Sequence, residues 1–222
     1  MSVHRPFIDD RQHLALLEGQ RYVVLRPTGM ISDSYGQVRA SIKERLVGLP
    51  VSYPAHPHVT LAGFPKGTLV NSVQQLVAEW AAAISDLRLE VERVSIFPTP
   101  FQIVIVQIRK TAELMNAFVS LRELASEHKL AELSTIQPIE WIFHMSVAYC
   151  SSLEPSAWTK VSSFVETLHV VPAQCVVGEA EIVAFDDGHE HLSGVVCLSA
   201  PSSLAGLRRA GRIERPETEV TD

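Results

Sequence analysis

Two short stretches place a histidine and a hydroxyl residue two positions apart within an apolar segment. The first is HVTL, with His58 and Thr60, and the second is HMSV, with His144 and Ser146. Side chains alternate faces along a strand, so each histidine and its hydroxyl partner point the same way while the apolar residues point into a core. Each stretch therefore predicts a two-residue polar patch on an otherwise apolar strand.

The pairing of the two histidines indicates acid–base chemistry. A single histidine on such a strand is more often structural than catalytic. Two of them facing one cleft could remove one proton and donate another in the same reaction, because histidine titrates near neutral pH. The hydroxyls of Thr60 and Ser146 could donate hydrogen bonds to a developing oxyanion or a phosphoryl oxygen. The residues alone leave open which histidine is the base and which is the acid.

Alternating strands and helices must position these patches, and the hydrophobic periodicity predicts where they lie. The expected strands are residues 21–27, 58–64, 87–97, 101–108, 141–149, 173–185 and 191–199, and the expected helices are 34–49, 72–85, 111–128 and 154–168. The last two strands are expected to form a hairpin around the turn DDGHE. The order of elements makes the two halves of the chain loosely similar, and each half contains one H-x-[S/T] strand.

The two motifs resemble the paired H-x-[S/T]-hydrophobic motifs of the 2H phosphoesterase superfamily, which includes bacterial 2′-5′ RNA ligase-like proteins and cyclic phosphodiesterases. The resemblance extends from about Arg21 to Ala200, and SIFPTPFQIVIVQI is similar to the family's Phe-Pro turn beside the active cleft. The chain departs from the pattern at two positions. Ser146 replaces the commoner Thr, and Phe143 precedes His144 where many members have Pro.

This resemblance implies an α+β fold with two lobes, in which two antiparallel sheets line a central cleft and helices lie outside. Each sheet would contribute one motif to the cleft. Residues 1–200 are accordingly expected to form a single bilobal domain. Residues 201–222 mix small and charged residues without an apolar face, so we expect them to form a disordered tail.

The same resemblance implies a metal-independent phosphodiesterase without a cofactor. It would hydrolyse a 2′,3′-cyclic phosphate, or an ADP-ribose 1″,2″-cyclic phosphate, of a nucleotide or short oligonucleotide. His58 and His144 would be the base and the acid, and Thr60 and Ser146 would hold phosphoryl oxygens. Two alternatives stay open: 2′-5′ RNA ligase or 2′-5′ phosphodiesterase activity on RNA ends, and a nucleotide-binding module without turnover.

Other residues near the predicted cleft have two interpretations each. Phe97, Phe101 and Tyr149 could stack on a nucleobase, although aromatic residues on strands are more often part of the core. Arg26, near the end of a predicted strand, either contacts phosphate or is simply exposed to solvent. The stretch GHEH has a spacing that could ligate a metal, but its acidic glycine turn favours a solvated hairpin tip, and no metal site is expected.

Composition narrows the class of partner. The net charge of −6 argues against a generic polyanion binder and against long RNA, because affinity for a nucleic-acid backbone comes from clustered Lys and Arg. No apolar run approaches the roughly 20 residues that span a bilayer, and the N-terminal segment lacks the layout of a secretory signal. Three cysteines in apolar runs, without C-x-x-C spacing, are expected to be buried free thiols. We therefore expect a cytoplasmic monomer that acts on a small nucleotide or short RNA ends.

Overall fold

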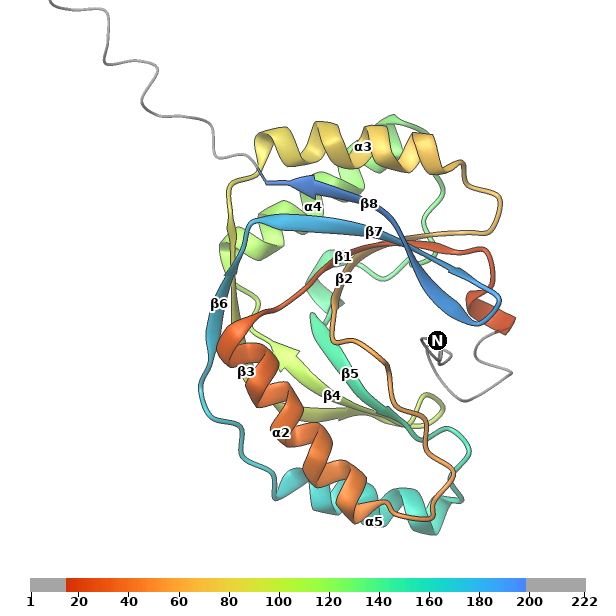
Figure 1. Ribbon diagram of the computed structural model, residues 1–222, viewed down its shortest axis with the longest axis vertical. Coiled ribbons are helices and arrows are strands. Elements are labelled where there is room, and N and C mark those ends of the chain that lie inside the picture. The colour runs from red at the N-terminus through yellow and green to blue at the C-terminus, as the bar shows by residue number, and fades with distance from the viewer. Residues whose placement is uncertain (1–14, 199–222) are drawn as a thin grey trace, which may run out of the picture.

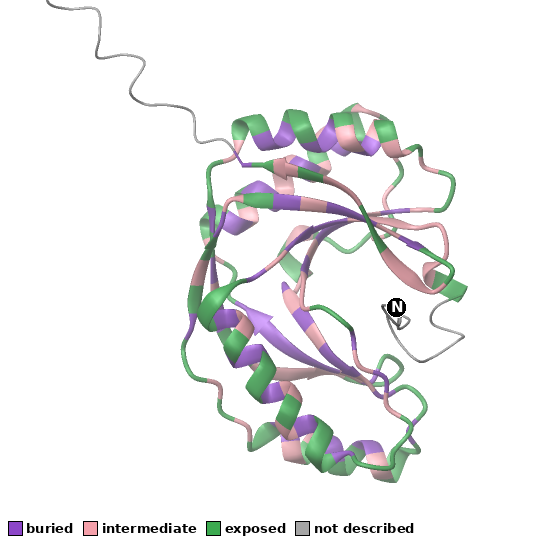
Figure 2. Ribbon diagram, viewed as in Figure 1, coloured by how far each residue is buried: buried purple, intermediate pink, exposed green. Residues whose placement is uncertain are grey.

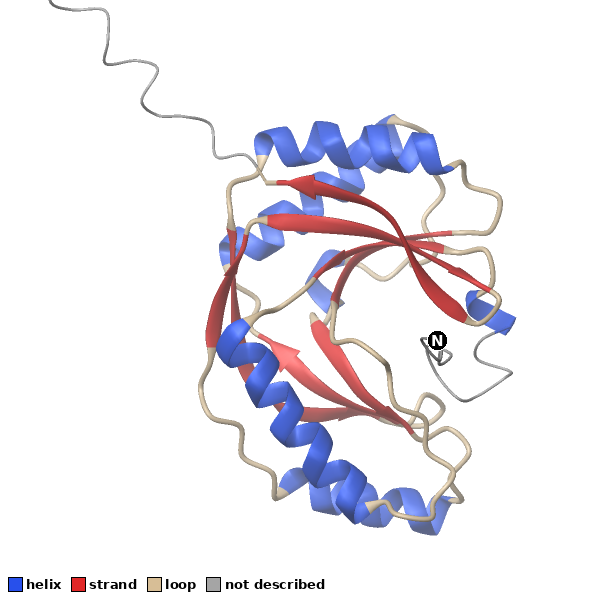
Figure 3. Ribbon diagram, viewed as in Figure 1, coloured by secondary structure: helices blue, strands red, loops and turns tan. Residues whose placement is uncertain are grey.

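Two four-stranded antiparallel sheets face each other at the centre of the molecule, with helices on their outer sides (Figure 1 and Figure 3). This computed structural model describes residues 15–198. The tail predicted for residues 201–222 lies outside the described residues. The architecture confirms the predicted α+β fold with two antiparallel sheets.

The first sheet has the strand order β2-β1-β7-β8, and the second has the order β5-β4-β3-β6. The strands of the first sheet are β1 (Arg21–Leu25), β2 (Val59–Phe64), β7 (Glu179–Asp186) and β8 (His189–Cys197). Those of the second are β3 (Leu87–Phe97), β4 (Ile103–Ile108), β5 (His144–Tyr149) and β6 (Gln174–Val177). Strands β2 and β5 are thus edge strands of different sheets, and they contact each other.

Residues 15–17 are helical, and four longer helices and one 3-10 turn follow: α2 (Gly29–Arg45), α3 (Val70–Ala83), α4 (Ala112–Glu127), η1 (Pro138–Glu140) and α5 (Pro155–Glu166). Helix α3 packs on β7 and β8, α2 packs on β5 and β6, and α4 contacts strands of both sheets. Figure 2 shows buried residues along the helix sides that face the sheets. One apolar core therefore extends through both sheets and fixes their relative position.

Helix α4 begins where its sequence predicts. The side chain of Thr111 accepts a hydrogen bond from the backbone N–H of Leu114, as a helix N-cap does. Helix α2, by contrast, begins earlier than residue 34, because its buried stripe already starts at Ile31. It ends at Arg45 rather than at residue 49, and Gly48 just beyond it has a φ of 79°.

The apolar run 173–185, predicted as one strand, forms two strands in different sheets. Val177, at the end of β6, pairs with Leu87 of β3, whereas β7 pairs with β1. Gly178 lies between them, where an added Cβ would come within 3.1 Å of the Asp86 carboxylate. The expected burial of all three cysteines is correct only for Cys150, since Cys175 is half-buried and Cys197 is exposed.

None of the helices within residues 15–198 is both long and apolar enough to cross a membrane.

Candidate active site

The first histidine patch lies at the start of β2. Val59 and Leu61 are buried in the core, so the alternation of the strand directs His58 and Thr60 to the opposite face. Thr60, on the edge strand β2, pairs with Val24 of β1. The apolar residues of HVTL thus anchor the strand while the polar ones face the space between the sheets.

The second patch lies on β5 and repeats this arrangement. Met145 and Val147 are fully buried, and His144 and Ser146 lie on the other face. His144 pairs with Gln107 and Ser146 with Ile105, both on β4. Two strands far apart in the sequence therefore present the same His and hydroxyl pattern from opposite sheets.

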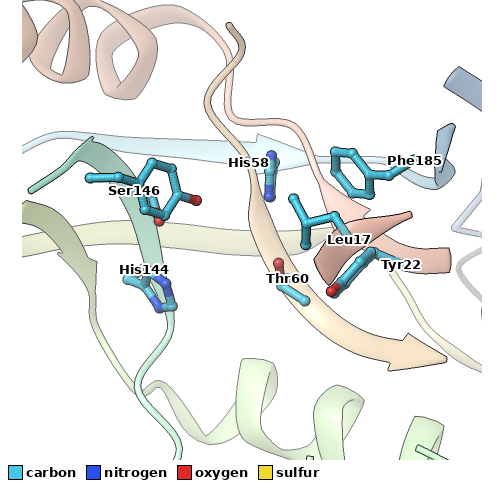
Figure 4. A pocket seen from close by; sticks show the side chains of 8 residues that line it. Leu17, Tyr22, His58, Thr60, His144, Ser146 and Phe185 are labelled. Atoms are coloured by element: carbon cyan, nitrogen blue, oxygen red, sulfur yellow. The ribbon is translucent and has the colours of Figure 1, made fainter. Parts of the chain in front are cut away.

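The residues of both patches line a single cavity (Figure 4). It has a volume of about 130 Å³ and is lined by Leu17, Tyr22, His58, Thr60, His144, Ser146, Tyr149 and Phe185. Figure 4 shows His58 and Thr60 on one strand and His144 and Ser146 on the other. Five of the seven residues expected to form the site thus lie around one space.

A β-bulge follows the hydroxyl residue in both motif strands. On β2 the register runs from Thr60 opposite Val24 to Ala62 opposite Val23, so Leu61 is the extra residue. On β5 it runs from Ser146 to Ala148, so Val147 is extra. Because a bulge shifts the side-chain alternation by one residue, the next side chain of β5 to reach the cavity is Tyr149 rather than Ala148.

The ring of His144 is held on two sides. Its Nδ1 donates a hydrogen bond to the carbonyl oxygen of Ile142 at 2.8 Å, and Phe97 packs edge-on against it with ring centroids 4.8 Å apart. Burial lowers the pKa of His144 below its ordinary value, and the bond to Ile142 only partly offsets this. The neutral ring with a proton on Nδ1 leaves Nε2 to meet a substrate.

The ring of His58 lies beside opposite charges. Its Nδ1 is 3.4 Å from Nη1 of Arg26 and 3.9 Å from Oε2 of Glu190. Burial, followed by the charges of Arg26 and His144, lowers the pKa of His58 to about 3. Because this pKa lies far below physiological pH, the His58 ring is neutral there; 17% of its side chain is exposed.

Hydroxyl groups surround Ser146. The phenol of Tyr35 donates a hydrogen bond to the backbone oxygen of Ser146 at 3.0 Å, and the side chains of Ser146 and Tyr149 are hydrogen-bonded. Burial raises the pKa of Tyr149, and it raises that of Tyr22 to about 12. The phenols at the cavity are therefore neutral.

The remaining two expected residues, Phe97 and Phe101, line a neighbouring apolar pocket of about 300 Å³. This pocket is formed by Phe97, Phe101, Ile103, Ile136, Glu140, Trp141, Ile142 and His144. His144 lines both spaces, so the apolar pocket lies directly beside the cavity of the two histidines. Phe101 is 62% exposed and forms no part of the core.

The GHEH hairpin differs from the solvated tip that the sequence predicts. His191 is exposed, but the side chain of Glu190 is only 10% exposed and forms an ion pair with Arg26. Arg26 is therefore not an exposed strand end, and it does not line the cavity of the two histidines. Neither this pairing nor the contribution of Tyr22 is indicated by the sequence, because both depend on contacts between distant strands. Within residues 15–198 no group of three or more His, Cys, Asp and Glu side chains could hold a metal ion.

Solved structures with this fold include a protein described as a phosphoesterase, with a TM-score of 0.59 and 15% sequence identity. The match covers 82% of this chain and 99% of that one. E. coli LigT in complex with NADP+ has a TM-score of 0.56 and 16% identity, over 82% of this chain and 99% of LigT. LigT in complex with 3′-AMP has a TM-score of 0.55 and 13% identity, over 82% and 98% of the two chains. At these identities the similarity establishes the fold.

No curated protein sequence matches the chain. The sequence model of the 2′-5′ RNA ligase superfamily, however, matches residues 27–189, which include both histidine motifs and the whole of strands β2 to β7. The agreement of this match with the two-sheet fold shows that the chain belongs to the 2′-5′ RNA ligase superfamily of 2H phosphoesterases.

Proposed function

We propose that this protein is a phosphodiesterase that opens a cyclic phosphate on a nucleotide or short oligonucleotide. One observation carries the proposal: two histidines and two hydroxyl residues, contributed by opposite sheets, line one cavity. Two histidines on opposite sides of a phosphorus atom fit an in-line displacement, in which the attacking and leaving oxygens lie on opposite sides.

The residues divide the reaction between proton transfer and charge stabilisation. One histidine removes a proton from water as the water oxygen bonds to phosphorus. The other protonates the ribose oxygen as its bond to phosphorus breaks. Thr60 and Ser146 donate hydrogen bonds to the non-bridging oxygens, where negative charge accumulates in the transition state. The products are a phosphomonoester and a free ribose hydroxyl.

The electrostatics of the cavity favour a singly charged phosphodiester. Among the described residues that line the cavity there is no Lys or Arg, and both histidines are neutral when the site is empty. Such a site compensates little negative charge. A cyclic phosphodiester carries one negative charge, whereas the ring-opened monoester carries nearly two at neutral pH. The lining therefore favours the proposed substrate over its product.

The sizes of the two spaces support a nucleotide substrate. The cavity of about 130 Å³ is smaller than the roughly 300 to 1,000 Å³ of sites that enclose a whole small ligand, so it fits the phosphate and its immediate surroundings. The neighbouring pocket, with Phe97, Phe101 and Trp141, fits a flat nucleobase. E. coli LigT structures contain NADP+ and 3′-AMP, which is consistent with a nucleotide ligand here.

The deciding experiment is incubation with 2′,3′-cyclic nucleotides, ADP-ribose 1″,2″-cyclic phosphate and 2′-5′-linked oligonucleotides, with and without EDTA. Phosphorus NMR identifies the products. We expect ring opening of a cyclic phosphate that survives chelation. Cleavage or joining of 2′-5′ linkages alone would favour the ligase-type reaction. Binding of nucleotides without turnover of any substrate would indicate a binding module instead.

A further inference from the structure

The apolar pocket beside the histidine cavity contains one acidic side chain. Six of its eight lining residues are apolar, and a seventh is His144, which lies next to the reaction site. The eighth is Glu140, an exposed residue at the end of η1. Within residues 15–198 the carboxylate of Glu140 takes part in no ion pair or hydrogen bond. A single polar group in an apolar pocket is the kind of group that orients a ligand and selects it.

The neighbours of Glu140 on both sides are held in place. The ring of Trp141 stacks on the buried ring of Phe118, with centroids 5.1 Å apart and 25° between the ring planes. On the other side, Nζ of Lys110 donates a hydrogen bond to the carbonyl oxygen of Ile139 at 2.7 Å. The backbone of Glu140 therefore lies between two anchored residues, and only its side chain is free to adjust to a ligand.

Glu140 lies within the length of one nucleotide from the reaction site. Glu140 and His144 line the same pocket and are four residues apart, a distance that even a fully extended chain limits to about 14 Å. A base in this pocket contacts apolar and aromatic walls on its other sides. Its hydrogen-bonding edge therefore meets a polar partner only where it turns toward Glu140 or toward solvent.

We propose that Glu140 selects guanine, so that the preferred substrate is guanosine 2′,3′-cyclic phosphate or a short oligonucleotide that ends in it. The inference rests on the proposed function and deepens it by naming the base. A carboxylate accepts hydrogen bonds at both oxygens and donates none. Guanine presents two adjacent donors, the N1–H and the N2 amino group, on its Watson–Crick edge. Both oxygens of Glu140 can therefore accept from guanine at once, and such bidentate pairs with a charged group are strong.

The other bases match a carboxylate less well. Adenine has its N6 amino group beside the acceptor N1, and cytosine has its N4 amino group beside the acceptor N3. Uracil has a single N3–H between two carbonyl oxygens. Each of these edges places an acceptor opposite one carboxylate oxygen, which repels it. Because Glu140 is exposed, water competes for its oxygens, and we expect a preference for guanine of about 10- to 100-fold rather than the larger ratios of buried sites.

The first experiment compares kcat/KM for the 2′,3′-cyclic phosphates of guanosine, adenosine, cytidine, uridine and inosine. Guanosine should exceed adenosine, cytidine and uridine by about 10- to 100-fold. Inosine keeps the N1–H of guanosine but lacks the N2 amino group, so its kcat/KM should lie between those of guanosine and adenosine. Equal values for all five substrates, or a preference for another base, would overturn the inference.

The variant Glu140→Gln tests the role of the carboxylate itself. Glutamine has nearly the same shape, but it presents one acceptor and one donor, which match the N6 amino group and the N1 of adenine. The ratio of kcat/KM for guanosine over adenosine should therefore fall at least tenfold. Glu166→Gln is the matched control, because it removes the same charge from an exposed position at the end of α5, outside the pocket. An unchanged ratio in Glu140→Gln would show that Glu140 does not recognise the base.

Calorimetric binding of 3′-GMP and 3′-AMP tests the same selection without turnover. The unchanged protein should bind 3′-GMP at least tenfold more tightly than 3′-AMP, and Glu140→Gln should lose this difference. Equal affinities, or binding of neither nucleotide, would overturn the inference. Guanine-selective binding by a protein that turns over no cyclic phosphate would instead contradict only the proposed function. Turnover of cyclic phosphates without any base preference would contradict only the role of Glu140.

Discussion

Acid should destabilise this protein partly through His58. The unfolded chain binds a proton at this histidine near pH 6.5, whereas burial and the charge of Arg26 lower the folded-state pKa to about 3. The unfolded state therefore binds more protons between these values, and stability is lost as the pH falls from 6.5 toward 3. A pH of 5 lies about 1.5 units below the pKa of His58 in the unfolded chain, so the protein loses about 2 kcal/mol of unfolding free energy there. This loss hardly depends on the folded-state pKa of His58 as long as that pKa lies below about 4.

The assay is urea unfolding at pH 7.5 and pH 5.0 for the unchanged protein and for His58→Gln. The unchanged protein should lose about 2 kcal/mol more free energy of unfolding between these two pH values than the variant, because Gln binds no proton. His169→Gln, in an exposed loop, controls for the loss of a histidine as such. Equal losses for the unchanged protein and His58→Gln would refute the view that the fold holds His58 neutral.

Three further outcomes concern the reaction. His58→Ala and His144→Ala should each lower turnover by about 10²- to 10⁴-fold in steady-state kinetics. The fold reduction in the double variant should be smaller than the product of the two single reductions. Thr60→Val keeps the branched shape that suits a strand and should lower kcat by about 10²-fold without changing the shape of the pH profile. Wild-type rates in that variant would mean that the hydroxyl contacts no phosphate. Burial lowers the pKa of both histidines, so the one that acts as the acid loses its proton by about pH 6.5, and kcat/KM should fall about tenfold per pH unit above that value. A plateau through pH 8 would contradict acid catalysis by a histidine.

Local patterns in the sequence were sufficient to predict most elements of this fold. The predicted strand at residues 87–97 has the same ends as β3, and the helix predicted from residue 111 begins there with Thr111 as its N-cap, because alternation and capping depend on neighbouring residues. The positions of His58, Thr60, His144 and Ser146 around one cavity also follow from alternation, once the two strands are placed opposite each other.

Contacts between distant segments do not follow from local sequence patterns. Arg26 and Glu190 are 164 residues apart, and neither a strand-end arginine nor a glutamate in a glycine turn indicates burial by itself. The crossing at Gly178 was hidden for a related reason. An apolar run gives the same periodicity whether it stays in one sheet or passes between two, so only the pairing with β3 and β1 reveals it.

The bulges explain why an apolar residue follows the hydroxyl in both motifs. Leu61 and Val147 are the inserted residues, and each is buried next to a buried alanine, so the strand presents two successive side chains to the core. Such a step anchors the strand immediately after the His and hydroxyl pair, which stay on the cavity side. On β2 the shift also brings Gly63 opposite Tyr22, where an added Cβ would lie 2.9 Å from the phenol ring. The space that glycine leaves is what allows Tyr22 to line the cavity beside Thr60.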